Sequence, residues 1–396
     1  MVEIELSIIS VPGSSDLVDK ALKEFEAQSG IRVKVHNMSW DSAWNELVRA
    51  AIYKKHGLDV SEVGSTWVGD LMEMNALHSF NQPEIRTIGG PEAFIQSAWL
   101  NGSSAGGKVS WAIPWLADSR FLYYRRDWLE KAGVDEKTAF KTPAAFANTL
   151  QAIKDAGSDF PWVIPSRKTG MSLHNVAAWV WGAGGHFLSQ DGKSTRFSEP
   201  AALQGFTQYF ELGRFLAPTA HDLDDRQSDA MYWQGKAAAT ISGPWLLREP
   251  SMEPEIATKT GITFPPGVPF VGGSSLVIWE DSPNRREALA LVKFLTSEYV
   301  QRNFLQNVGL LPVRIDVLSA PPFSDNPTYQ SLSDGLQIGR SFRLLHLWGL
   351  VEDRLSKSLS FIWNKVLQEP ETNVAEVVEQ ELSVLARQLD RILSGG

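Results

Sequence analysis

The start of the chain alternates between apolar and polar positions in a way that predicts a strand, a helix and a second strand. Apolar residues occupy every second position from Glu3 to Ser10, which is the period of a half-buried strand. After a break at Pro12–Ser15, apolar residues recur at helical spacing from Val18 to Phe25, and Gly30 ends this segment. Alternation resumes over Ile31–Val35. Such a strand–helix–strand unit predicts two parallel strands joined by a right-handed crossover.

Loops at the ends of these strands are the first candidate binding residues. In parallel sheets, ligands bind beyond the carboxyl ends of the strands. Two such loops are Ser10–Ser15 and Met38–Trp44, and a third, Gly64–Trp67, follows the short apolar strand Asp59–Val63. The residues of these loops with side chains suited to a ligand are Ser14, Trp40, Asp41, Ser65 and Trp67.

The rest of the chain mixes helical segments with short strands, which predicts an α/β fold. Helical periodicity covers segments near Pro143–Ala156, Glu199–Phe215, Asn284–Thr296 and Val374–Leu393. An apolar strand, Ser275–Trp279, follows a proline-rich break. The last helix places its apolar residues on one face toward the core, namely Val378, Leu382, Leu385, Leu389 and Ile392.

Two adjacent glycines in the segment Gly272–Ser275 directly precede this apolar strand. Glycine at such a place frees backbone amides that can donate to ligand oxygens, and it is equally compatible with a plain turn. Gly273 and Ser274 are therefore candidate ligand-binding residues.

Length, charge and composition exclude several classes of protein. A chain of 396 residues predicts two or three domains. The net charge of −9 and the absence of a basic stripe argue against nucleic acid as a partner. The sequence has no cysteine, no paired histidine spacing and no calcium-loop spacing, so neither a metal nor a cofactor is expected. No apolar run approaches the roughly 18 residues of a membrane-spanning helix.

The unusual feature of the composition is its 15 tryptophans. Each ring of a sugar has an apolar C–H face and a belt of hydroxyls, so flat aromatic side chains suit the face and carboxylates suit the edge. A cleft lined by tryptophan together with a few Asp, Ser and His side chains is that combination. Trp40, Trp44 and Trp115 are equally compatible with this role and with core packing.

Four segments resemble one family of proteins and occur in that family's order. They are GSTWVGDLMEMNALHSF from Gly64, WAIPWLADSRFLYYRRDWLEKAG from Trp111, GKAAATISGPWLL from Gly235, and the long segment beginning FVGGSSLVIWEDSPNRREALALVKFL at Phe270. Together they resemble the family 1 extracellular solute-binding proteins of ABC importers, the maltose-binding-protein-like group. The resemblance runs over nearly the whole chain.

The resemblance implies a two-lobed periplasmic-binding-protein type II fold, in which each lobe is a mostly parallel sheet flanked by helices. The ligand cleft lies at the hinge, where the chain crosses twice. Lobe 1 is expected to comprise 1–117 and 271–320, and lobe 2 to comprise 118–270 and 321–396. The implied protein is a monomeric receptor in the periplasm or outside the cell that delivers its ligand to the permease subunits of an ABC transporter. Its signal or lipid-anchored leader is expected to be absent from this sequence.

The resemblance also assigns roles to single residues. Asp118 matches the family's acidic acceptor of sugar hydroxyls, and Trp245 and Trp348 match stacking tryptophans. Ser65 and Trp67 lie where the first lobe contacts sugar. The resemblance places Ser172 and His174 in a ligand loop of the second lobe, where they replace an acid and a tyrosine, and Trp67 replaces an aspartate. These departures argue against maltose itself and leave a glucoside or another oligosaccharide as the implied ligand.

A glycoside hydrolase is the alternative interpretation, because enzymes of that class also have clefts lined by tryptophan and carboxylates. A hydrolase needs two carboxylates about 5 to 9.5 Å apart on either side of the scissile bond. Only Asp118 is placed in the cleft by the resemblance, and no GxSxG nucleophile motif is present. The sequence therefore predicts a receptor without catalytic residues.

Overall fold

The computed structural model describes residues 2–9, 15–53, 57–104, 109–167, 170–248, 251–303, 311–321, 323–325, 327–342, 345 and 347–394. Contacts divide the chain into two compact units. Unit 1 comprises Met1–Ser119 and Val271–Gly349, and unit 2 comprises Arg120–Phe270 and Leu350–Gly396.

These boundaries differ from the expected ones mainly over the segment 321–349, which belongs to unit 1 rather than to the second lobe. The physical reason lies at the start of β8. The Val271 amide donates to the Arg340 carbonyl at 2.8 Å, and the Ser341 hydroxyl donates to the Val271 carbonyl. The chain consequently passes between the units three times, after Ser119, Phe270 and Gly349, rather than twice.

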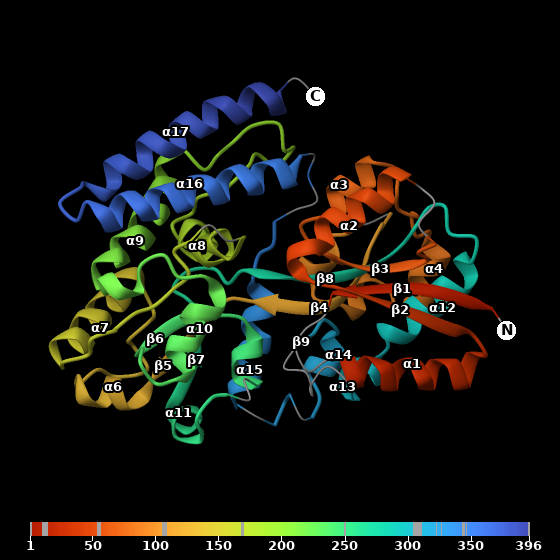
Figure 1. The fold of residues 1–396 in the computed structure, drawn as a ribbon, viewed down its shortest axis with the longest axis horizontal. Coiled ribbons are helices and arrows are strands. Elements are labelled where there is room, and N and C mark those ends of the chain that lie inside the picture. The colour runs from red at the N-terminus through yellow and green to blue at the C-terminus, as the bar shows by residue number, and fades with distance from the viewer. Residues whose placement is uncertain are drawn as a thin grey trace. The chain divides into compact units, whose positions relative to one another are not determined.

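Unit 1 contains a mixed sheet with helices on both faces (Figure 1). Its strands are β1 (Glu3–Ile9), β2 (Arg32–Met38), β3 (Val60–Gly64), β4 (Ile113–Ser119), β8 (Val271–Ile278) and β9 (Leu311–Pro312). Its helices are α1 (Ser15–Ser29), α2 (Trp40–Tyr53), α3 (Val68–Glu73), α4 (Gln82–Ile88), η1 (Pro91–Ala93), α5 (Gln96–Leu100), α12 (Arg285–Leu295), α13 (Glu298–Asn303), α14 (Ile315–Leu318) and α15 (Pro327–Ile338).

The described strands of this sheet lie in the order β2-β1-β3-β8-β4-β9. β1 pairs in parallel with β2 and β3, which confirms the predicted strand–helix–strand unit. β8 lies antiparallel between β3 and β4, and β9 is antiparallel to β4. Because β2 and β3 both run parallel to β1, their carboxyl ends meet at one edge of the sheet.

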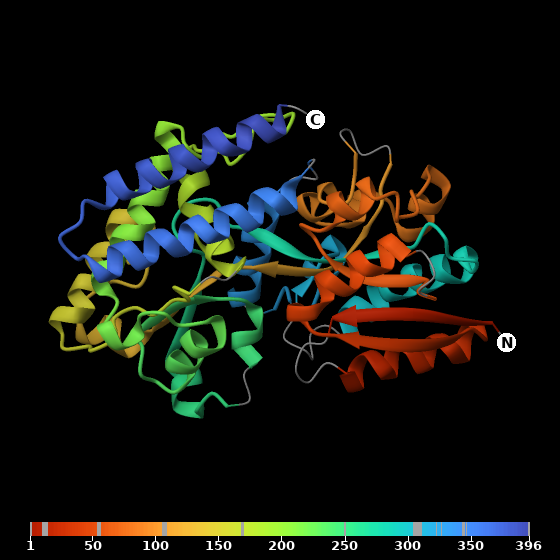
Figure 2. The same ribbon diagram turned by 45° about the horizontal axis from the view of Figure 1, so that its top comes forward.

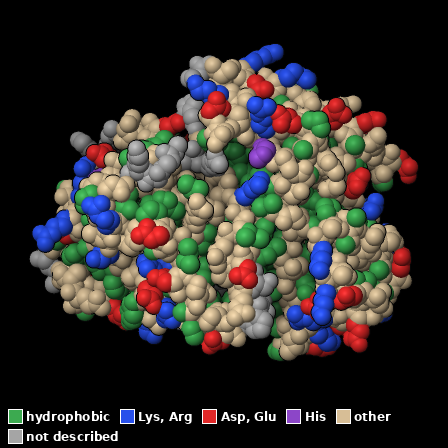
Figure 3. All heavy atoms as spheres, turned by 180° about the vertical axis from the view of Figure 1, so that it is seen from behind, with side chains coloured by type: hydrophobic (Ala, Val, Ile, Leu, Met, Phe, Trp, Pro, Cys, Tyr) green, Lys and Arg blue, Asp and Glu red, His purple; other side chains and the backbone are tan. Residues whose placement is uncertain are grey.

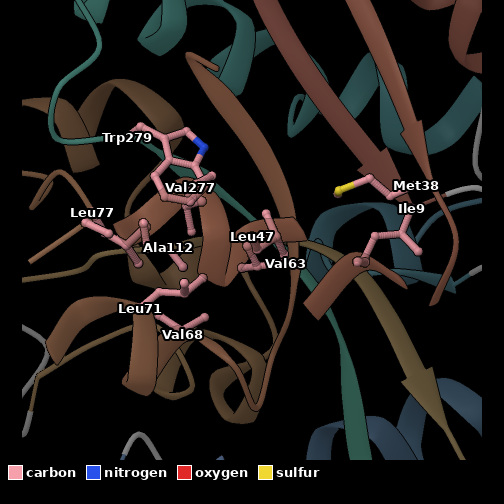
Figure 4. Close-up of a cluster of buried hydrophobic side chains, with 14 residues drawn as sticks. Ile9, Met38, Leu47, Val63, Val68, Leu71, Leu77, Ala112, Val277 and Trp279 are labelled. Atoms are coloured by element: carbon pink, nitrogen blue, oxygen red, sulfur yellow. The ribbon is translucent and has the colours of Figure 1, made fainter. Parts of the chain in front are cut away.

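The core of unit 1 on one sheet face is formed by α2 and α3 packing on the strands (Figure 4). Leu47 of α2 and Leu71 of α3 are fully buried against Val63 and Val277. On the other face, Ala21 of α1 packs against α12 and α13. The alternation of β1 is what divides its side chains between these two layers.

Unit 2 contains a smaller sheet and most of the remaining helices. Its strands are β5 (Phe121–Arg125), β6 (Ala239–Ser242) and β7 (Thr260–Thr263). Its helices are α6 (Arg126–Lys131), α7 (Pro143–Asp155), α8 (Gly170–Gly182), α9 (Pro200–Phe210), η2 (Glu211–Phe215), η3 (Pro218–Ala220), α10 (Asp225–Trp233), η4 (Pro244–Arg248), α11 (Pro254–Lys259), α16 (Trp348–Gln368, whose first two residues fall in unit 1) and α17 (Val374–Leu393).

The expectation of a mostly parallel sheet in each lobe is wrong for unit 2. β5 lies between β6 and β7 and pairs antiparallel with both. β6 and β7 therefore run in the same direction and are joined through η4 and α11, as in a crossover unit. The central position is taken by a strand that arrives directly from β4 and runs the opposite way.

The helices predicted from periodicity are present as α7, α9, α12 and α17, and α17 has the predicted bounds. In α17 the predicted stripe is buried at Val378, Leu382, Leu385 and Leu389. Ile392 is instead 46% exposed, and Leu393 takes the buried position at 3%. α16 and α17 lie side by side in both views (Figures 1 and 2), and the Ser358 hydroxyl donates to Glu381 at 2.6 Å.

Candidate functional site

Three tryptophans gather at the carboxyl ends of β2 and β3 in unit 1, and we call them the aromatic group: Trp40, Trp44 and Trp67. Trp40 begins α2 directly after β2, and Trp67 precedes the first turn of α3 after β3. The ring centroid of Trp67 lies 5.6 Å from those of both Trp40 and Trp44. Trp40 is 48% exposed, so the aromatic group reaches the surface. Flat apolar rings open to solvent at strand ends are suited to the C–H face of a sugar.

The loop between β3 and α3 is tied to β8 by its backbone. The half-buried Ser65 donates its amide to the Gly273 carbonyl at 3.0 Å. Gly273 and Ser274 lie inside β8, not in a loop before the strand as expected. Gly273 has a φ of +131°, and a Cβ atom there would lie 1.9 Å from the Leu116 carbonyl oxygen. The glycine is therefore required by the close approach of β8 and β4.

A buried acid that the sequence analysis missed lies beside this loop. Glu62 in β3 is 2% exposed and accepts a hydrogen bond from the Ile9 amide at 2.7 Å. Burial raises the pKa of the Glu62 carboxyl to about 7, although the Ser274 hydroxyl and the Ile9 amide lower it. The only feature of the sequence that could have marked Glu62 as a buried acid is that it is the one acid within a strand of apolar or small residues.

β4 carries two of the predicted residues. Asp118 is half-buried and pairs in register with Gly272 of β8. Trp115 lies at an irregularity of the pairing between Pro114 and Leu116, and it is 4% exposed. Its carbonyl accepts a hydrogen bond from the buried Gln301 amide at 2.6 Å. The bulge turns Trp115 into the packed interior, whereas Asp118 keeps partial access to solvent.

In unit 2, Trp245 lies in η4 directly after β6 and is half-buried. Its indole N–H donates to Asp229 Oδ2 at 3.0 Å, and the Arg120 guanidinium lies 5.0 Å from its ring centroid. A Cβ atom on Gly243 would lie 2.0 Å from the six-membered ring, so the glycine leaves the space that the indole occupies. Burial raises the pKa of the Asp229 carboxyl to about 6, against the hydrogen bonds from Trp245 and Ser242.

Ser172 and His174 lie in the first turns of α8, not in a loop as the resemblance implied. Ser172 is 1% exposed. The half-buried His174 ring stacks on Phe270 with centroids 4.3 Å apart and an interplanar angle of 11°. Its Nε2 atom lies 3.4 Å from Oε1 of Glu352 in α16. The sequence held no signal for Phe270 and Glu352, because both meet α8 only in the folded chain.

The remaining predicted residues are placed as follows. Trp348, the first residue of α16, is 3% exposed, and its ring stacks on Phe342 with centroids 4.5 Å apart. Ser14 lies outside the described residues. Asp41 is described only as part of the α2 backbone. The structure therefore brings Trp40, Ser65 and Trp67 together in unit 1, whereas Trp245 and His174 have separate surroundings in unit 2.

A surface hollow of about 480 Å³ lies in unit 1 between the C-terminal ends of α1 and α4 and the helix α12. Its lining includes Phe25, Phe294, Arg86 and Lys293, but none of the residues predicted from the sequence. We give more weight to the aromatic group and Trp245, because their flat rings and adjacent polar groups match sugar chemistry, whereas this hollow combines two phenyl rings with cations.

The described part of the chain contains neither a metal-binding cluster nor a membrane-spanning helix. No cluster of three or more His, Asp or Glu side chains there is arranged to hold a metal ion. None of its helices is both long enough and apolar enough to cross a bilayer.

Fold and site together define a two-unit α/β binding protein with open aromatic surfaces. The model of the bacterial extracellular solute-binding protein family matches residues 20–331. The chain belongs to this family, which confirms the resemblance predicted from its motifs. A putative binding protein of Brucella abortus (strain 2308) is 24% identical over 361 residues, which are 87% of this chain and 84% of that protein.

Solved structures with the same fold confirm the predicted fold class. A solute-binding protein of an ABC transporter from Thermotoga lettingae, bound with α-D-tagatose, superimposes with a TM-score of 0.84 at 22% identity. The superposition covers 99% of this chain and 100% of the Thermotoga lettingae chain. The sugar-binding protein MalE from Xanthomonas citri has a TM-score of 0.83 at 21% identity and covers 100% and 98% of the two chains.

Proposed function

We propose that this protein is an extracytoplasmic receptor that captures a mono- or oligosaccharide and delivers it to an ABC transporter. The observation that carries the proposal is the aromatic group at the carboxyl ends of β2 and β3, with Trp40 48% exposed. Trp245, held by Asp229, offers a second flat surface in unit 2. The similar proteins from Thermotoga lettingae and Xanthomonas citri are named for tagatose and sugar binding, which supports the same class of ligand.

The proposed ligand residues combine flat stacking surfaces with hydroxyl, imidazole and carboxylate groups. Aromatic rings favour the apolar faces of sugars, and the carboxylate of Asp118 accepts hydroxyl protons through charge-assisted hydrogen bonds. The proposed set is Ser14, Trp40, Asp41, Ser65, Trp67, Trp115, Asp118, Ser172, His174, Trp245, Gly273, Ser274 and Trp348. On the face shown in Figure 3, basic and acidic side chains are interspersed.

A thermal-shift screen tests the proposal. Each of D-glucose, D-tagatose, ribitol, maltose and maltotriose is added at millimolar concentration, and the melting temperature is measured. A ligand present at 100 times its Kd stabilises the folded state by about 2.7 kcal/mol, so at least one sugar should raise the melting temperature by several degrees. If no carbohydrate shifts the melting temperature while an amino acid or a peptide does, the protein is a receptor for another class of solute.

We favour a receptor without catalytic activity over a glycoside hydrolase. Asp41 and Asp118 belong to the proposed set of unit 1, and Glu62 lies beside it but is buried with an oxygen bonded to the Ile9 amide. A hydrolase needs both carboxylates exposed to the sugar on either side of one bond. Incubation with nitrophenyl glycosides should therefore release no nitrophenol, and release would support the enzyme instead.

Replacing the proposed acceptor of sugar hydroxyls should weaken binding without unfolding the protein. Asp118→Ala is expected to cost about 2 kcal/mol of binding free energy, within the range for hydrogen bonds to a charged group. The fold should survive, because Asp118 is only half-buried at the end of β4. Calorimetric titration measures the loss, and Asp118→Asn, which keeps an acceptor without charge, should lose less. Wild-type affinity in both variants would remove Asp118 from the proposed site.

We further propose that ligand binding is coupled to closure of the two units in a monomer, as in other hinged receptors. Small-angle scattering should then show a smaller radius of gyration at saturating sugar, with no change in molecular mass. An unchanged radius would support a rigid binding site. Delivery to permease subunits and a lipid anchor belong to the same proposal, and pull-down of the permease from membranes tests the first of these.

A further inference from the structure

Trp245 is surrounded by an unusual set of partners for a partly exposed aromatic residue. Its indole N–H donates to Asp229, which is 5% exposed, and Arg120, which is 2% exposed, covers its ring. A buried acid and a buried base thus both contact one half-buried indole. Asp229 comes from α10 and Arg120 from the start of β5, so different elements determine where the ring lies (Figure 1).

The backbone beside the ring is held as well. Gly243 leaves no room for a Cβ atom, which would meet the six-membered ring of Trp245 at 2.0 Å. The Gly243 carbonyl in turn accepts a hydrogen bond from the Tyr123 hydroxyl of β5 at 2.7 Å, and Tyr123 is fully buried. The turn after β6, which carries Trp245, is therefore anchored to the central strand of the sheet.

Core packing alone does not require these partners. An indole that only fills space is satisfied by apolar neighbours, whereas burying a carboxylate costs free energy unless it is paired and hydrogen-bonded. Asp229 receives hydrogen bonds from Trp245 and Ser242, and the charged groups that face it are Asp225 of α10 and Arg120. Asp229 and Arg120 are thus two charged residues in contact with this indole, one at its N–H and one over its ring.

We propose that Asp229 and Arg120 are positioning residues that hold the Trp245 indole in the single orientation in which it stacks on a sugar ring. This inference rests on the proposed function. A side chain that is already ordered before the ligand arrives loses no rotamer entropy on binding, and this loss is about 0.5–1.5 kcal/mol for one side chain. Asp229 and Arg120 need not touch the sugar, because they act through Trp245.

The test is a double-mutant cycle on ligand affinity, measured with whichever of D-glucose, D-tagatose, ribitol, maltose and maltotriose binds the wild type. Asp229→Leu is expected to weaken binding about three- to tenfold at pH 7.5, the range that freezing one side chain corresponds to. Asp229→Asn, which keeps an acceptor for the indole N–H, should bind within about twofold of the wild type. In the Trp245→Ala background, Asp229→Leu should have no further effect, because its action passes through the indole.

The control variant is Asp225→Asn, which removes a charge from the same helix but leaves the indole's hydrogen bond intact. It should bind like the wild type. The pH profile supplies a second readout. Between pH 7.5 and pH 5, wild-type affinity should fall about twofold more than that of Asp229→Asn, because only the wild type has a carboxyl at position 229 that takes up a proton.

The outcomes separate the two claims. If the wild type binds none of these sugars, the proposed function is contradicted and this inference with it. Two outcomes would contradict the positioning role alone, in a wild type that does bind a sugar. One is that Asp229→Leu binds as tightly as the wild type. The other is that Asp229→Leu weakens binding by the same factor in the Trp245→Ala background as in the wild-type background. If Asp229→Leu does not fold, the pH profiles of the wild type and Asp229→Asn decide the question, and parallel profiles overturn the role.

Discussion

Gly273→Ala should destabilise unit 1 by at least about 4 kcal/mol, the largest effect we expect from any single methyl group in this protein. The added Cβ atom would lie 1.9 Å from the Leu116 carbonyl oxygen, and both atoms belong to paired strands that cannot separate cheaply. The backbone φ of +131° adds strain of about 1–3 kcal/mol for a residue with a side chain. Losses above 4 kcal/mol are rare and mark a defined steric cause.

Gly30→Ala is the matched control in the same unit. Gly30 follows α1 with a φ of +72°, and no atom lies within 4 Å of the place where its Cβ would be. Its substitution therefore measures backbone strain without a clash, and we expect a loss of about 1–2 kcal/mol. Urea unfolding of both variants gives the comparison. Equal losses would show that β8 moves away from β4 at little cost, and the steric argument for Gly273 would then be wrong.

Glu62→Gln should make the protein more stable than the wild type at alkaline pH, by about 3 kcal/mol. The folded pKa of Glu62 is raised to about 7 from the ordinary value of 4.5, so the folded state favours the protonated carboxyl. The contribution of Glu62 to stability is fully present below pH 4.5 and is lost as the pH rises through 7. A difference of roughly 2.5 pKa units corresponds to about 3 kcal/mol. The uncharged amide of the variant has no such dependence.

Glu5→Gln is the control, because the pKa of Glu5 on the neighbouring strand β1 is shifted in the opposite direction to that of Glu62. Burial raises the pKa of Glu5, but hydrogen bonds and charge interactions with Lys34 and His36 outweigh it and lower the pKa overall. Glu5 therefore contributes stability above its unfolded pKa and loses it as the pH falls, so Glu5→Gln should be less stable than the wild type near neutral pH. Unfolding at pH 4, 6 and 9 tests both variants. A Glu62→Gln variant whose stability follows the wild-type profile would show that Glu62 stays charged.

The surroundings of Trp245 show how far motifs in the sequence lead toward the site. The segment GKAAATISGPWLL was sufficient to single out Trp245 as a candidate stacking residue. Its partners Asp229 and Arg120 were not found, because no local pattern in the sequence marks either residue as a neighbour of Trp245. Only the packing of α10 on β6 shows that this carboxylate is buried and bonded to the indole.

The sequence by itself determined the elements whose signal is local. The periodicity that defines α1 and α17, and the alternation of β1 and β2, depend on residues within one or two turns of each other, so they are readable before the chain folds. The ordered motifs were enough to predict the family and the fold class. In the same way, the strand-end loops of Trp40 and Trp67 followed from the parallel unit at the start of the chain.

Only the tertiary structure decided strand direction, burial and the resulting chemistry. Nothing near β5 in the sequence states that β6 and β7 will flank it antiparallel. The bond from Ile9 to Glu62 joins residues 53 apart, and the bond from Gln301 to Trp115 joins residues 186 apart. The pKa of a carboxyl and the exposure of an indole depend on all neighbours in space. The physical reason is that these long-range contacts do not exist until the chain has folded.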